Sequence, residues 1–148
     1  MGVVETERHG QERRPDSPRR AAATAPVTEI MATTIVCART DVPVADLIRT
    51  MTNERLGCVP IVDEQERPIG MITKLDLVEW FQNPAGTLAG DVMMPIAITL
   101  DASATVAHAA SIMACEDMHH VMIVSERALI GLVSTMDVTR WLAGQKTE

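Results

Sequence analysis

The stretch Gly70-Met-Ile-Thr-Lys-Leu-Asp-Leu77 decides how this chain is interpreted, because it returns as Gly131-Leu-Val-Ser-Thr-Met-Asp-Val138. Each copy consists of a glycine, a short apolar strand that ends in a hydroxyl residue, and an aspartate three positions later. This order predicts a hydroxyl and a carboxylate side by side where a strand leads into a helix. Because the pattern occurs twice, chance is a poor explanation of either copy.

The rest of the chain repeats with almost the same period. Val59 corresponds to Val121, an offset of 121 − 59 = 62, and Gly70 corresponds to Gly131, an offset of 131 − 70 = 61. One residue has been lost in the polar turn between these positions, where a change of loop length costs little. We therefore expect two copies of one unit. The predicted division is a flexible N-terminal arm at 1–25, a first unit at 26–83, a linker at 84–90 and a second unit at 91–148.

Within each copy the apolar residues change from helical to strand spacing. Val44, Leu47, Ile48 and Met51 recur as in a helix with one buried stripe, and Gly57 is expected to end that helix in the left-handed conformation. The first copy is predicted to hold an extended segment at 34–37, this helix, strands at 58–62 and 69–73, and a helix at 74–81. The second is predicted to hold an extended segment at 97–100, a helix through 106–113, strands at 121–124 and 129–134, and a helix ending at 142.

These elements predict an α+β (α/β-like) fold of two tandem β-α-β-β-α units. A unit this small cannot bury a sufficient core alone. We therefore expect the two units to pack sheet to sheet, related by pseudo-two-fold symmetry.

The composition favours an intracellular domain over a nucleic-acid or membrane protein. The net charge is −7, and the first 25 residues hold five Arg against four acids, which leaves 13 − 5 = 8 basic and 20 − 4 = 16 acidic residues elsewhere. So acidic a globular part binds a phosphate backbone poorly. The sequence lacks the run of about 18 apolar residues that a membrane span needs. Three Cys without a C-x-x-C spacing favour reduced thiols in a cytoplasm.

The duplicated motif has two physical interpretations. An ionised carboxylate accepts two hydrogen bonds from the cis-diol of a ribose, and the unpaired N–H groups at a helix start suit a phosphate. A hydroxyl residue followed three positions later by an acid is also a capping box, in which Thr73 and Asp76 satisfy each other's backbone donors. The same holds for Ser134 and Asp137. Because one pair of residues can serve both purposes, both interpretations stay open.

Two tandem units that each close with this motif resemble a cystathionine β-synthase-type (CBS) domain pair, the Bateman module. The resemblance covers residues 28 to about 143. Members of that family usually bind adenosine-containing ligands between the two copies and regulate an attached enzyme, channel or transporter. The resemblance implies that Asp76 and Asp137 accept hydrogen bonds from ribose hydroxyls, and that Thr73 and Ser134 meet the phosphate.

The resemblance also implies which residues border the base. They lie on the first extended segment and before the middle strand of each copy: Thr34, Ile35, Ala97, Ile98, Gly57, Cys58, His119 and His120. The second copy has His119-His120 where the first has Gly57-Cys58, and it lacks the Gly and the later Pro that are usual there. The second base pocket is therefore expected to differ from the first.

The charged residues near the motif limit the phosphate content of the expected ligand. Lys74 follows Thr73, but its counterpart in the second copy is the neutral Thr135. The other candidate cations have no position that the sequence assigns: Arg39, Arg55, Arg127 and Arg140. AMP or ADP is therefore expected in preference to ATP, with NAD and S-adenosylmethionine as further candidates.

Other chemistries have little support in the sequence. His108, Cys115, Glu116, His119 and His120 carry side chains of metal-ligating type, but no second pair at ligand spacing completes a site. The chain has no nucleophile elbow, H-E-x-x-H, P-loop or Rossmann fingerprint. No catalytic residue, metal or cofactor is therefore assigned, and an enzyme is not expected.

The resemblance leads to one functional hypothesis and one alternative. The chain is expected to be a regulatory module that binds an adenine nucleotide. Because the sequence holds no effector domain, it would act in trans on an unidentified protein or through a homodimer. Trp80 and Trp141 occupy matching positions on the last helices, where they are either core residues or part of a self-association face. The alternative is an interaction scaffold whose pockets bind no ligand.

Overall fold

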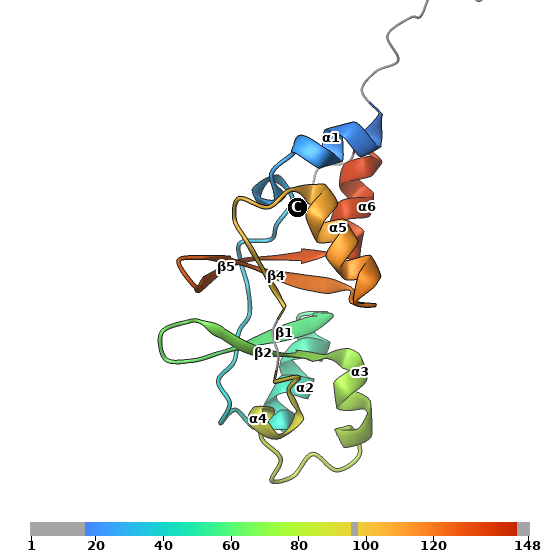
Figure 1. Cartoon of the computed structure of the whole chain (residues 1–148). Helices are drawn as coiled ribbons and strands as arrows, with labels where there is room; N and C mark the ends of the chain where they lie inside the picture. Colours follow the sequence, from blue (N-terminus) through green and yellow to red (C-terminus); the bar gives the residue numbers. More distant parts are fainter. Residues whose placement is uncertain (1–16, 96–97, 145–148) are drawn as a thin grey trace, which may run out of the picture.

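The computed structural model describes residues 17–95 and 98–144, and these residues form the α+β fold of two units that the repeat predicts. Two small sheets face each other, and the helices of each unit lie on the outer side of its sheet (Figure 1). In each unit a helix, two antiparallel strands and a further helix follow one another. The expected packing of sheet on sheet is confirmed.

The first unit is built around a β-hairpin. Its elements are α2 (Val44–Asn53), β1 (Cys58–Val62), β2 (Pro68–Thr73), α3 (Lys74–Leu77) and the 3-10 helix η2 (Val78–Trp80). α2 buries Val44, Leu47 and Met51, the apolar stripe that the sequence predicts. A shift in the pairing of β1 with β2 leaves Ile69 as the extra residue of a β-bulge.

The second unit has the same hairpin and one more strand. Its elements are β3 (Thr99–Asp101), α5 (Val106–Cys115), β4 (His120–Ser125), β5 (Ala128–Ser134) and α6 (Thr135–Leu142). β3 runs parallel to β4, and β5 carries its bulge at Ile130, the position equivalent to Ile69. Among the described residues the first unit lacks a counterpart of β3, because its extended segment ends in a single bridge from Ala38 to Ile61.

The segment that leads into each unit packs on the other unit. We call residues 26–38 the first lead-in and residues 88–95 the second lead-in. They contain the 3-10 helix η1 (Val27–Glu29) and α4 (Ala89–Val92), respectively. Ala32 exchanges two backbone hydrogen bonds of 2.8 and 3.0 Å with Leu132 of the second unit. In the second lead-in, the Met94 N–H donates to the Met71 carbonyl of the first unit at 3.1 Å.

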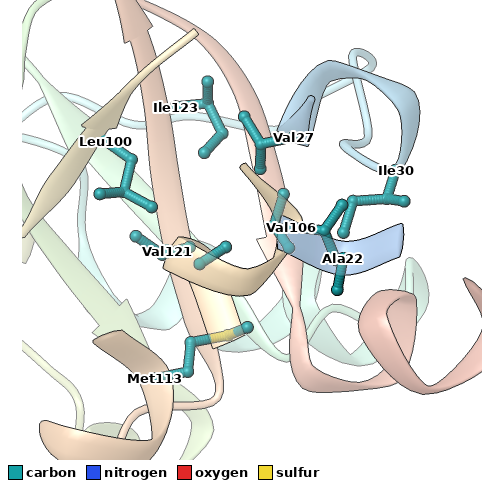
Figure 2. Packing of buried hydrophobic residues seen from close by; sticks show 10 residues of the cluster. Ala22, Val27, Ile30, Leu100, Val106, Met113, Val121 and Ile123 are labelled. Atoms are coloured by element: carbon teal, nitrogen blue, oxygen red, sulfur yellow. The ribbon is translucent and has the colours of Figure 1, made fainter. Parts of the chain in front are cut away.

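The hydrophobic core of the second unit therefore contains side chains from the start of the chain. Ala22 of α1 (Pro18–Thr24), Val27 and Ile30 are buried among residues of β3, α5 and β4 (Figure 2). The Val106 N–H donates to the Ala25 carbonyl at 2.9 Å, which fixes α5 to the arriving chain. Val27 and Ile30 are at most 1% exposed, and such burial contributes about 1.5–3 kcal/mol for each side chain.

The core of the first unit has the reciprocal arrangement. Ala89 is fully buried in it, and Val92 and Met93 pack against it. The Ala89 N–H donates to the Val42 carbonyl at 2.8 Å. The core of each unit is therefore completed by the segment that leads into the other unit.

The glycine that begins each motif allows each lead-in to cross over and pack on the other unit. We call this exchange of lead-ins the crossing. A Cβ atom on Gly70 would lie 2.7 Å from both the Met93 Sδ and the Met94 carbonyl oxygen. A Cβ atom on Gly131 would collide with the side chain of Met31. Contacts this short do not occur between real side chains, so each lead-in lies flat on a strand position that has no side chain.

The space between the two sheets is filled by sulfur-containing and aliphatic side chains. Cys58, Met71 and Met122 are buried there, and Met118, Leu129 and Leu132 pack around them. Methionine suits such an interface because its flexible thioether fills irregular gaps. The hairpins are also joined directly, since the Leu129 N–H donates to the Glu66 carbonyl at 3.1 Å.

Three local expectations differ from the structure. The predicted arm lies outside the described residues up to position 16, but residues 18–24 form α1, which packs against α5 and buries Ala22. The helix expected at 74–81 is α-helical only to Leu77 and continues as a 3-10 turn. Gly57 is not left-handed. Arg55 instead takes the positive φ of 54° after α2.

The crossing predicts an order of destabilisation in two glycine variants. Gly70→Ala should lower the free energy of unfolding by about 1–3 kcal/mol, and by more than Gly131→Ala, because only Gly70 faces a backbone oxygen that cannot turn away. Adding Met31→Ala should recover part of the loss in Gly131→Ala, whereas Met93→Ala should not rescue Gly70→Ala. Urea unfolding measures all of these values. Glycine variants as stable as the wild type would contradict the crossing.

Candidate functional site

Each motif forms a capping box at the start of its helix. The Thr73 N–H donates to the Asp76 Oδ2 at 2.7 Å, and the Asp76 N–H donates to the Thr73 Oγ1 at 3.4 Å. At α6 the Ser134 N–H donates to the Asp137 Oδ2 at 2.8 Å, and the Asp137 N–H donates to the Ser134 Oγ at 3.1 Å. The capping interpretation of the motif is therefore confirmed in both units.

The capping boxes leave one face of each carboxylate available. In both aspartates the same oxygen, Oδ2, accepts the capping bonds, and among the described residues Oδ1 has no hydrogen-bond partner. Asp76 and Asp137 are half-buried, so solvent reaches them. A carboxylate held in place by its cap can still accept a hydrogen bond from a diol through its second oxygen.

The backbone before each middle strand is fixed to the same helix start. The Gly57 carbonyl accepts the Lys74 N–H at 3.2 Å, and the His119 carbonyl accepts the Thr135 N–H at 2.9 Å. Cys58 pairs in register with Thr73, and His120 pairs with Ser134. The structure thus brings the predicted residues before each middle strand together with the motif of the same unit.

His120 links the motifs of the two units. Its imidazole lies so close to Gly57 that a Cβ atom there would be 2.9 Å from the His120 Cε1. Burial is the main cause that lowers the pKa of His120 below the ordinary value of 6.5, and His119 and Lys74 lower it further, whereas Asp137 acts to raise it. The missing side chain of Gly57 makes room for this ring.

A cleft of about 430 Å³ lies between the units on the side of the first lead-in. Ile35, Cys37 and Ala38 of the lead-in line it, and the two hairpins contribute Val62, Glu66, Leu129 and Ile130. Arg39 is the cation in this lining. The volume is that of a small-molecule site, and the walls combine apolar side chains with the polar Thr33, Arg39 and Glu66. Ile130 of the cleft and Ser134 of the motif are four residues apart on β5, roughly 13 Å at 3.3 Å per residue. A ligand that touches both would therefore lie along the strand.

The remaining predicted site residues are dispersed. Thr34 is exposed beside Ile35 on the first lead-in, and Ile98 is half-buried just before β3, whereas Ala97 lies outside the described residues. Cys58 is buried between the sheets, where burial raises the pKa of its thiol to about 12, so it packs as a core residue. The Lys74 side chain lines a groove between α2 and α3 and is not part of the cleft lining.

Sequence reasoning missed most of the residues that line the cleft. Arg39 was a cation without an assigned position, and Glu66, Leu129 and Ile130 carried no motif. Ile130 enters the lining where the bulge of β5 interrupts the regular pairing. The one early signal was the family resemblance, which implied that Ile35 borders the base.

Over residues 17–95 and 98–144, no three His, Cys, Asp or Glu side chains gather in a way that could hold a metal ion. None of the helices in that part of the chain is long and apolar enough to span a bilayer.

Comparison with known proteins identifies both units. The family model of the CBS domain matches residues 27–83 and 89–144. The chain is 26% identical over 136 residues to the uncharacterized protein MJ1404 of Methanocaldococcus jannaschii, covering 81% of this chain and 32% of that protein. It is 33% identical over 93 residues to the uncharacterized protein MK0525 of Methanopyrus kandleri, covering 60% of this chain and 47% of that protein. The chain thus spans less than half the length of these two relatives.

A solved structure shares the fold. The CBS domain pair of protein MJ0100, in complex with 5′-methylthioadenosine and S-adenosyl-L-methionine, superposes with a TM-score of 0.75. It is 22% identical and covers 82% of this chain and 98% of that chain. The match confirms the arrangement of two units with facing sheets.

The surroundings of His120 predict a pH dependence of stability. Because the pKa of His120 is lower in the folded chain than the ordinary 6.5, the unfolded chain binds the proton more readily. The stability that depends on the neutral ring is present above about pH 6.5 and is lost as the pH falls. As the pH falls from about 7.5 to 5.5, the free energy of unfolding should therefore decrease in the wild type and decrease less in His120→Gln. The exposed His108→Gln is the control, and equal pH profiles for all three proteins would refute the assignment.

Proposed function

Since the chain belongs to the CBS domain family and carries two copies of the domain, we propose that it is a regulatory module that binds an adenosine-type ligand between them. Its role would be to report ligand occupancy to a partner protein, in trans or through its own dimer. A regulatory role is proposed in place of catalysis, because the described residues offer carboxylates and hydroxyls suited to holding a ribose and no nucleophile paired with a base.

The duplicated acid–hydroxyl pair is the observation that carries the proposal. Asp76 and Asp137 are each held by a capping box through Oδ2, and the Oδ1 atoms have no partner within the part of the chain that the structure describes. A fixed carboxylate loses little conformational entropy when it accepts a ribose hydroxyl. The complex of the MJ0100 CBS pair with two adenosine derivatives supports the ligand class.

The charges of the cleft favour a ligand with few phosphates. Arg39 is the cation in the lining, and Glu66 lies in the same lining. A triphosphate would bring several negative charges to a cleft whose lining holds one positive and one negative side chain. We therefore propose AMP or ADP in preference to ATP, and 5′-methylthioadenosine or S-adenosylmethionine as uncharged or cationic relatives to be compared.

One observation favours the alternative of a scaffold that binds no ligand. Both carboxylates already serve as caps, so the motif has a structural purpose in both units. A capping box stabilises a helix start by about 0.5–2 kcal/mol whether or not a ligand is present. The two functions are separated by a binding measurement that keeps the caps intact.

The double variant Asp76→Asn/Asp137→Asn makes that separation. Asparagine keeps an oxygen for the capping bond but lacks the charge that strengthens the bond to a ribose hydroxyl. Affinity for an adenosine ligand should fall about tenfold or more, while the melting temperature changes little. Calorimetric titrations with AMP, ADP, ATP, NAD, 5′-methylthioadenosine and S-adenosylmethionine measure the affinities.

Asp91→Asn is the matched control for this experiment. Asp91 Oδ2 accepts the Leu88 N–H at 2.9 Å at the start of α4, so it is also a capping aspartate, but it is outside the motif. The affinity of Asp91→Asn for each adenosine ligand should equal that of the wild type. Unchanged binding in the double variant would remove the two aspartates from the site. Absence of heat with every ligand would favour the scaffold.

We also propose that the chain forms a homodimer through the outer face of its motif helices. Leu75 and Met136 occupy equivalent positions on α3 and α6 and are 79% and 53% exposed, and Leu142 is 50% exposed. Large apolar side chains that are exposed at equivalent positions of both units suit a self-association face.

Met136→Glu should shift the chain toward the monomer, because a dimer would bury the new charge without a partner. Light scattering after size exclusion gives the mass. Met94→Glu, at an exposed methionine outside this face, should leave the mass unchanged. A wild-type chain that stays monomeric at high concentration would disprove the dimer.

A further inference from the structure

A large cavity lies on the helical side of the first unit, and it shares no lining residue with the cleft. It is a groove of about 850 Å³ between α2 and the α3–η2 segment. Its apolar lining comes from both sides: Ile48 and Met51 from α2, and Leu77, Val78 and Phe81 from the segment that follows β2. We call it the copy-one groove. Val78 and Phe81 are 65% and 68% exposed, so the groove presents apolar surface to solvent.

Two cations lie in the same lining. Arg55 follows the end of α2, and Lys74 begins α3. Neither side chain makes a hydrogen bond or an ion pair among the described residues, whereas Arg49 and Arg67 are each paired with an aspartate. Glu79 also lines the groove, so the lining holds two positive charges and one negative charge. The unpaired cations distinguish this apolar groove from a merely incomplete core.

The second unit provides an internal comparison. Its equivalent groove, between α5 and α6, measures about 350 Å³. Asp117 stands there in place of Arg55, at a φ of 53° against 54°, and Thr135 stands in place of Lys74. The repeat therefore keeps the backbone and removes both cations. The cationic character belongs to the first unit alone.

We propose that the copy-one groove binds an amphipathic anion, an aliphatic chain with a carboxylate head. The chain would lie on the apolar floor formed by α2 and η2, and the carboxylate would accept hydrogen bonds from Arg55 and Lys74. The charge complementarity selects this ligand, because an aliphatic cation would meet two like charges. This site is separate from the proposed adenosine site, and it stands whether or not the cleft binds a nucleotide.

Decanoate is the probe, and two methionines report on it. Met51 lines the copy-one groove and Met113 lines its counterpart. In a protein labelled with ¹³C at its methionine methyl groups, decanoate should shift the Met51 signal saturably and leave the Met113 signal in place. Affinity should rise from octanoate to decanoate by up to about fourfold per methylene, as expected for burial of CH₂ groups.

The charge is tested by Arg55→Asp, which copies the residue that the second unit has. Asp117 shows that aspartate is tolerated at this positive φ. Decanoate affinity should fall about fivefold to tenfold. Arg127→Asp makes the same charge change at another exposed position of positive φ, 71°, in the β4–β5 turn, and it should bind decanoate like the wild type. Decyltrimethylammonium should bind the wild type much more weakly than decanoate does.

Several outcomes would overturn the proposal. Equal shifts of the Met51 and Met113 signals would mean unspecific apolar contact, and no saturable shift would mean no site. A Met51 signal that shifts with protein concentration and does not change when decanoate is added would mean that a second copy fills the groove. Calorimetry with AMP on Arg55→Asp keeps the two sites apart. Loss of decanoate binding with unchanged AMP binding is expected, and failure of the adenosine site alone would leave the decanoate result intact.

Discussion

The exchange of lead-in segments is the constraint on which the rest of the structure depends. Each unit receives its missing core residues from the chain that leads into the other, with Ile30 buried in the second unit and Ala89 in the first. The exchange requires close approach of a lead-in to a strand, and a glycine at that point, Gly70 or Gly131, permits it. Two short repeats, neither with a sufficient core alone, thereby become one body.

The candidate site follows from the same crossing. β2 and β5 each end three residues after their glycine, at the hydroxyl residue of the capping box, so the close approach at the glycine fixes the distance from the lead-in to the motif. The first lead-in pairs with β5 at Ala32 and with β1 at Ala38. Between these two attachments it spans the gap between the sheets, and the cleft lies beside it. Fold and cleft therefore share one cause.

The sequence predicted what local patterns determine. The spacing of Val44, Leu47 and Met51 defined α2, and the repeat itself predicted two facing sheets. It could not predict α1, because a single buried residue, Ala22, anchors that helix to α5 far along the chain. The capping residues were identified correctly, but the cleft lining was not, because Arg39 and Glu66 come to line one cleft only in the folded chain. Tertiary contacts of this kind leave no periodicity in the sequence.

The two tryptophans allow the most direct test of the exchange. Trp80 packs against the core of the first unit and Trp141 against that of the second, so Trp141→Phe and Trp80→Phe each leave one reporter. If the exchange makes the units one cooperative body, urea unfolding followed by either tryptophan should, after correction for the stability change of each variant, coincide with the circular dichroism transition of the same protein. A separate transition for either tryptophan, with half of the helical signal retained, would contradict the account.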